Sequence, residues 1–167
     1  MSQIADIMNQ LLVPLQTYAA TVSGKAIIAS DLQHAWEYTQ GNENFPKIIL
    51  IYTGDRIRGD FQTASINRMA DIDFSVVVSR NRSLTTDRGA ALTNPVGNAI
   101  PLYQITEGVR DIIRYTSGLD QMKEWPVDYK GTSQWETGAF ISDAYSINFS
   151  MLIALPAELD AETVVSP

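Results

Sequence analysis

The sequence predicts an α+β fold built on a central, mostly antiparallel or mixed β-sheet with a long C-terminal strand. We expect an N-terminal helix and a second helix near residues 101–117 to flank this sheet. Two patterns lead to this prediction: apolar residues recur every three or four positions in both helices, and they alternate strictly in the final strand. The length of 167 residues and the 45% hydrophobic content suit one domain, which we assign to residues 1–155.

The first predicted helix covers residues 4–22, where an apolar stripe repeats at helical spacing. Pro14 lies inside this stripe. An interior proline removes a hydrogen bond and clashes with the preceding turn, so we expect a kink or break near Val13. A second, short helix is expected over residues 31–39, with Ser30 as its N-cap.

Two strands are expected in the middle of the chain. Residues 47–53 are apolar on both faces, as in an interior strand that is covered on both sides. Residues 73–79 are rich in β-branched and aromatic side chains, which strands favour. The polar, arginine-rich residues 54–71 between them form either a long loop or a protruding hairpin. Residues 83–98 form a second long connection, a kind of segment that often lies at interfaces.

The next predicted helix begins near Pro101 and ends before Gly118, two residues that favour these positions. Residues 126–135 are expected to pair with the final strand. We expect residues 156–167 to form an acidic, flexible C-terminal tail, because they hold few groups that could be buried in a core.

The final strand covers residues 145–155, about twice the usual strand length. One face is apolar throughout, whereas the other begins with Ser146, Asn148 and Ser150. A face open to bulk water usually carries larger, charged side chains. These small side chains therefore suggest that another element or a neighbouring subunit packs closely on this face.

The chain is acidic, with a formal net charge of −7, so nonspecific binding to duplex DNA is not expected. Residues 56–88 are the exception, with a net charge of +2. The cations of this segment are Arg56, Arg58, Arg68, Arg80, Arg82 and Arg88. They represent either ordinary surface variation or a basic edge that meets an acidic surface of a neighbouring subunit. Arginine suits the second interpretation because its planar fork pairs well with carboxylates.

The residues that carry most enzyme chemistry are scarce. Cysteine is absent, which excludes disulfides, thiolate metal sites and cysteine nucleophiles, and the single histidine, His34, is expected to be a surface or half-buried residue. Asp71 and Asp73 lie on one side of a strand, either as a divalent-metal pair or as solvated carboxylates. No glycine-rich phosphate-binding loop accompanies them. We therefore expect no catalytic activity, no cofactor and no bound metal.

The larger aromatic residues allow two interpretations: they line a ligand pocket, or they pack in the core or at a subunit contact, as we expect. They are Trp36, Trp125, Trp135, Tyr103, Tyr115, Tyr129 and Tyr145. Apolar runs are far shorter than the roughly 20 residues of a membrane helix, so no membrane partner is expected. The first residues lack the pattern of a secretory signal, and we expect synthesis in a cytoplasm without export.

Taken in order, these elements resemble the tail terminator proteins of long-tailed bacteriophages, a family of tail completion or head–tail joining proteins. The shared features are an N-terminal amphipathic helix, an interior strand at residues 47–52, a strand at 73–78, a helix at 102–116 and a long final strand at 143–155. The resemblance covers nearly the whole chain and rests on the order, the size and the style of the elements.

The resemblance implies a virion structural protein that is made in the host cytoplasm and has no catalytic activity. Its copies would form a ring, expected to be a hexamer, that caps the head-proximal end of the tail tube and joins it to the neck. The implied partners are other copies of the chain, the tail tube protein and a neck or connector protein. DNA would pass through the channel without specific binding.

Three alternatives remain open at this stage. A head–tail connector or head-completion protein is also a small ring-forming subunit of the same particle. A small metal-dependent hydrolase would use Asp71 and Asp73, and a divalent ion would then stabilise it in a thermal scan. A small-ligand binding domain outside viruses would behave as a monomer.

Overall fold

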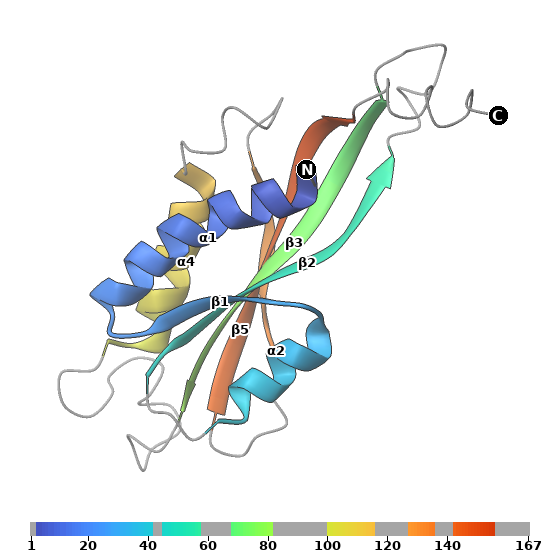
Figure 1. The fold of residues 1–167 in the computed structure, drawn as a ribbon. Helices are drawn as coiled ribbons and strands as arrows, with labels where there is room; N and C mark the ends of the chain where they lie inside the picture. Colours follow the sequence, from blue (N-terminus) through green and yellow to red (C-terminus); the bar gives the residue numbers. More distant parts are fainter. Residues whose placement is uncertain are drawn as a thin grey trace.

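The structure, a computed structural model, describes residues 3–41, 45–57, 68–81, 100–115, 127–135 and 142–155. Its strands form a five-stranded sheet in the order β1-β2-β3-β5-β4. Helices α1 and α4 lie on one side of the sheet and α2 lies on the other (Figure 1). The elements are α1 (Gln3–Thr21), β1 (Lys25–Ala29), α2 (Leu32–Thr39), β2 (Lys47–Ile57), β3 (Arg68–Asn81), α4 (Leu102–Tyr115), β4 (Asp128–Gln134) and β5 (Ser142–Leu155). The predicted α+β fold is confirmed.

The sheet is mixed. Strand β1 runs parallel to β2, whereas the β2–β3, β3–β5 and β5–β4 pairs are antiparallel. The predicted pairing of the segment around residues 128–134 with the final strand is confirmed. The edge strand β1 was not expected from the sequence, because its five residues, KAIIA, are too few to display an alternating pattern.

The main core fills the space between the sheet and the helices α1 and α4. It takes the inward stripe of each helix and alternate residues of β2, β3 and β5. The rings of Phe74 on β3 and Phe149 on β5 stack at its centre, with centroids 5.4 Å apart. A smaller cluster lies on the other side, under α2, and consists of Ala29, Ala35, Ile49, Ile51, Val77 and Ala144.

Helix α1 passes through Pro14 as one continuous element, so the expected break near Val13 does not occur. Leu11 and Leu15, one on each side of the proline, are fully buried and hold both halves of the helix against the sheet. The hydroxyl group of Thr17 donates a hydrogen bond to the carbonyl oxygen of Val13, at 3.1 Å. Core packing therefore outweighs the local cost of the proline.

The end of α1 is a Schellman turn. Ser23 has a φ of 57°. The amide of Gly24 donates to the carbonyl oxygen of Ala19 at 2.8 Å, and the amide of Ser23 donates to the carbonyl oxygen of Ala20 at 3.4 Å. The left-handed position that usually holds glycine is thus occupied by serine. Gly24 follows it and is needed for another reason, because a Cβ atom there would lie 2.5 Å from the carbonyl oxygen of Pro46.

Strands β2 and β3 are longer than predicted and continue as a two-stranded hairpin toward residues 58–67. The register shifts between Tyr52 and Gly54, where a bulge inserts one residue into β2. Beyond this bulge the residues Asp55, Arg56 and Ile57 are exposed, although they remain paired with β3. The hairpin interpretation of residues 54–71 therefore holds for the paired residues, whereas the residues between the strands lie outside the described part.

Two predicted segments fall on residues that the structure does not describe. These are the connection at 83–98 and the acidic tail at 156–167. The helix predicted near residues 101–117 is present as α4, preceded by Pro101.

Candidate functional site

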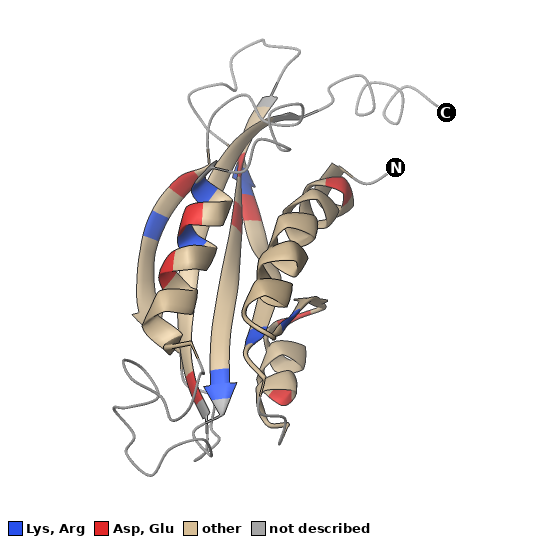
Figure 2. Ribbon diagram, turned by 90° about the vertical axis from the view of Figure 1, so that its left-hand side faces the viewer, with Lys and Arg blue, Asp and Glu red and all other residues tan. Residues whose placement is uncertain are grey.

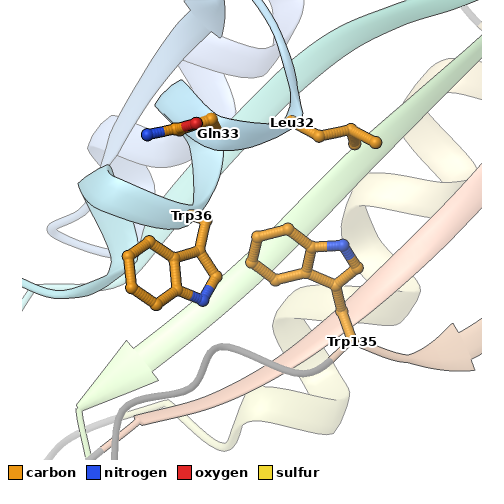
Figure 3. A pocket seen from close by; sticks show the side chains of 4 residues that line it. All are labelled: Leu32, Gln33, Trp36 and Trp135. Atoms are coloured by element: carbon orange, nitrogen blue, oxygen red, sulfur yellow. The ribbon is translucent and has the colours of Figure 1, made fainter.

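An open pocket of about 460 Å³ lies between α2 and the residue that follows β4. Leu32, Gln33 and Trp36 of α2 line one side, and Trp135 lines the other (Figure 3). The two indole rings project into the same space from different elements. Leu32 is 59% exposed and Trp36 is 42% exposed, so this pocket gathers apolar surface that the monomer leaves in contact with water.

The spacing of residues along α2 produces this exposed surface. Leu32 and Trp36 are four positions apart and therefore lie on the same side of the helix. The adjacent side of the helix is formed by Ala35 and Thr39, which are both buried against the sheet. Because alanine is small, α2 approaches the sheet closely at Ala35, and Leu32 and Trp36 lie beside this contact with much of their surface exposed.

Trp135 is held in place by the sheet. Its backbone amide donates a hydrogen bond to the carbonyl oxygen of Ala144, at 2.9 Å, which extends the pairing of β4 with β5. Its side chain is partly buried and packs against the smaller apolar cluster under α2. One wall of the pocket is therefore fixed by the fold.

Helix α2 is anchored at both ends. At its start the N-cap is Asp31, whose carboxylate accepts a hydrogen bond from the amide of His34 at 2.7 Å. The prediction that Ser30 caps this helix is therefore wrong. Ser30 instead donates a hydrogen bond from its backbone amide to the Nδ1 atom of His34, at 3.1 Å. At the end of the helix, the buried ammonium group of Lys47 donates to the carbonyl oxygen of Tyr38, at 2.8 Å. A cation here also complements the negative end of the helix dipole.

The charge of α2 and its cap is negative. The carboxylates of Asp31 and Glu37 are the charged groups of residues 31–39, which include no lysine or arginine. Glu37 accepts a hydrogen bond from the side-chain amide of Gln33, at 3.0 Å, and this bond positions Gln33 at the pocket. The pocket therefore combines two indole rings with an acidic helix.

His34 is exposed, which confirms the prediction of a surface or half-buried histidine. Its Nδ1 atom accepts from the amide of Ser30 and lies 3.3 Å from the Ser30 hydroxyl oxygen. These contacts close the first turn of α2, a structural role.

The predicted arginine edge is divided by the structure. Arg56 is exposed, and its Nε atom lies 3.2 Å from a carboxylate oxygen of Asp73. Arg80 is buried on the side of the sheet that faces α4, where it donates to the carbonyl oxygen of Ile100 and its pKa is lowered by burial. Nine positions of β3 separate Arg80 from Asp71, the residue opposite Arg56.

The two arginines therefore do not form one surface. Arg58, Arg82 and Arg88 lie outside the described residues, and the backbone of Arg68 begins β3 beside the C-terminal end of β5. Of the described side chains in this set, that of Arg56 is exposed and that of Arg80 is buried.

Asp71 and Asp73 do lie on one face of β3, as the alternation predicts. The carboxylate of Asp73 is engaged by Arg56, a cation that competes with any metal ion for it. Within the part of the chain that the structure describes, no group of three or more His, Asp or Glu side chains could hold a metal ion.

The small polar residues of β5 bond to one another and to β3. The side-chain oxygen of Asn148 accepts from the hydroxyl groups of Ser75, at 2.7 Å, and Ser146, at 3.1 Å. Ser146 and Ser150 are buried. Hydrogen bonds between side chains of β3 and β5 therefore account for part of this polar face. The sequence alone could not distinguish such a hydrogen-bonded face from one covered by another element or subunit.

The tyrosines pack mainly around the sheet. The ring of Tyr129 lies 5.8 Å from that of Phe149, and the rings of Tyr103 and Tyr145 meet edge to face at 5.6 Å. Core packing is thus confirmed for Tyr129 and Tyr145, whereas Trp36 lines a pocket. Trp125 and the side chain of Tyr115 lie outside the described part.

No family model matches the chain, and no curated protein sequence matches it. Among the helices of the described residues, none is long and apolar enough to cross a membrane.

Proposed function

We propose that the chain is a virion structural protein whose copies form a ring on the head-proximal end of a bacteriophage tail tube. The ring stops growth of the tube and joins the tail to the neck. The observation that carries this proposal is the outer face of α1, which is exposed and carries no charge.

The exposed positions of α1 are Ala5, Asn9, Val13, Gln16, Thr17, Ala20 and Thr21. None of them is charged, and Asp6 is the one charged residue in the 19 residues of this helix. Figure 2 shows the contrast with α4, which carries both acidic and basic residues. Val13, at the centre of the face, is 63% exposed.

A helix face that stays in water normally carries charged side chains, whereas the centres of protein interfaces are depleted in them. The outer face of α1 therefore suits burial against another protein. Each subunit of a capping ring must contact the tube by one such face, and we assign this contact to α1. The tail tube end is the partner that the proposal commits to.

Four carboxylates of the described residues have contacts that suit a structural role. Asp31 caps α2, Asp55 accepts from the hydroxyl of Tyr52 at 2.8 Å, Asp73 pairs with Arg56, and Asp128 pairs with Lys130 at 2.9 Å. These carboxylates stabilise local structure. The net charge of −7 also suits a ring through which DNA passes, because like charges prevent tight contacts with phosphates.

Purified chain, tail tube protein and portal rings would test the proposal. We expect the chain to form annuli in negative-stain images, to decorate tube ends and to stop tube elongation. The matched control is the portal ring alone, which we expect the chain not to bind. A chain that binds portal rings and ignores tube ends, or that stays monomeric and binds neither, would overturn the proposal.

A further inference from the structure

We propose that the pocket between α2 and Trp135 is one half of a head-to-tail contact between copies of this chain. The other half is formed by Arg56 and Ile57, the last residues of β2, where it pairs with β3; we call these two residues the hairpin end. This inference rests on the proposed function and adds to it the surfaces by which neighbouring subunits recognise each other.

The two surfaces lie at opposite ends of the sheet. Ile57 is opposite Ala70 on β3, whereas Trp135 bonds to Ala144, which is opposite Ser79 on β3. The nine positions from Ala70 to Ser79 span about 30 Å of strand. One copy therefore cannot bring its own hairpin end into its own pocket.

A contact between two different surfaces of the same chain is heterologous, and repeated heterologous contacts close into a ring when the rotation between copies permits. The sheet thus offers what a ring subunit needs, namely one surface at each end. The contact leaves the outer face of α1 free for the tube.

The apolar parts of the two surfaces are complementary. Ile57 is 48% exposed at the hairpin end, and Leu32 and Trp36 expose their side chains at the pocket. A pocket of about 460 Å³ is large enough for a branched aliphatic side chain and its neighbours. Tryptophans in such pockets often supply much of the binding energy of a protein contact.

The charges are complementary as well. Asp31 and Glu37 make the pocket helix acidic, whereas the described end of β2 carries the guanidinium of Arg56. The side chain of Arg56 remains 67% exposed although it pairs with Asp73. An exposed ion pair of this kind contributes little to stability. Arg56 contacts Asp73 through Nε and one terminal nitrogen, so its guanidinium group has further N–H donors for a carboxylate of a neighbouring copy.

Sedimentation velocity of full-length variants tests the contact. A pocket variant, Leu32→Ala with Trp36→Ala, and a hairpin variant, Arg56→Glu with Ile57→Glu, should each weaken self-association by about tenfold or more. The matched control is Tyr103→Ala on α4, because Tyr103 is as exposed as Trp36 but belongs to neither surface. Circular dichroism checks that each variant is folded.

Mixing the two variants is the decisive step. The pocket variant keeps an intact hairpin end and the hairpin variant keeps an intact pocket, so a one-to-one mixture should form dimers that neither variant forms alone. A mixture that stays monomeric, or variants that assemble like the wild type, would overturn the contact. Annuli that form through the contact but ignore tube ends would overturn the proposed function alone, and a wild-type chain that never self-associates would overturn both.

Discussion

The ammonium group of Lys47, at the start of β2, lies 2.8 Å from the backbone carbonyl oxygen of Tyr38, near the end of α2. The same group lies 5.0 Å from the centre of the Tyr38 ring and 3.5 Å from the carbonyl oxygen of Gly41. Lys47 is buried, so this cation is satisfied by the end of the helix. Lys47 thus fastens the C-terminal end of the helix that carries Leu32 and Trp36 to the start of β2.

Lys47→Met should lower the free energy of unfolding by about 1.5–3 kcal/mol, because hydrogen bonds to a buried charged group are lost while the apolar stem is kept. Urea denaturation measures this change. The control is Lys25→Met, since Lys25 is exposed and lies 5.1 Å from the Phe45 ring centre, a contact worth about 0.5–1 kcal/mol. Equal effects of the two changes would contradict the anchoring role.

In the turn after α1, we predict opposite effects on stability for substitutions at two neighbouring residues. Gly24→Ala should destabilise the protein by about 1–3 kcal/mol, because the new Cβ atom would lie 2.5 Å from the carbonyl oxygen of Pro46, a backbone atom that cannot move freely. Ser23→Gly should be neutral or stabilising by up to about 1 kcal/mol, since Ser23 already has a positive φ. Thermal denaturation distinguishes the two signs, and stabilisation by Gly24→Ala would show that the clash is absent.

Two tyrosines make the protein sensitive to alkaline pH. Burial and the hydrogen bond to Asp55 raise the pKa of Tyr52 to about 12, and the hydrogen bond to Tyr103, followed by burial, raises the pKa of Tyr145 to about 12. Above the ordinary tyrosine pKa of about 10 the unfolded chain releases these protons while the folded chain keeps them. Their contribution to stability is therefore complete below pH 10 and is lost as the pH rises toward 12.

Urea denaturation between pH 9 and pH 12 checks this prediction. The double variant Tyr52→Phe, Tyr145→Phe should be less stable than the wild type at pH 9, where it lacks both hydrogen bonds. The difference should shrink as the pH rises. A difference that stays constant across this range would mean that neither tyrosine titrates as the geometry requires.

The sequence predicts the parts of the fold that have a strong periodic signal. The alternation of Tyr145, Ile147, Phe149 and Met151 identifies β5, and the helical spacing from Leu102 onward identifies α4, because each pattern extends over several turns or pairs. The strand β1 is too short for such a pattern and is defined by its parallel pairing with β2, a long-range contact. The continuity of α1 through Pro14 also depends on the core and not on local preference.

The candidate site was harder to predict than the fold. Trp36 and Trp135 lie far apart in the sequence, and their approach depends on the packing of α2 over the sheet end. The spacing along α2 did not reveal this site, because positions 32, 35, 36 and 39 form one helical stripe that would be expected to face the core as a whole. The structure buries only the smaller members of this stripe, Ala35 and Thr39, and leaves Leu32 and Trp36 exposed. The separation of Arg56 from Arg80 likewise follows from the strand register, which charge counts along the chain do not contain.

The outer face of α1 gives a last prediction, which concerns assembly. Val13→Glu places a carboxylate at the centre of the uncharged face, where burial against the tube end would then cost the desolvation of a charge. Because Val13 is 63% exposed, the change should leave folding and self-association intact and reduce tube capping, measured as decorated ends in negative-stain images, by about tenfold or more. The matched control is Gln104→Glu on α4, an exposed residue of a helix that already carries charges. Normal capping by Val13→Glu would place the tube contact elsewhere on the subunit.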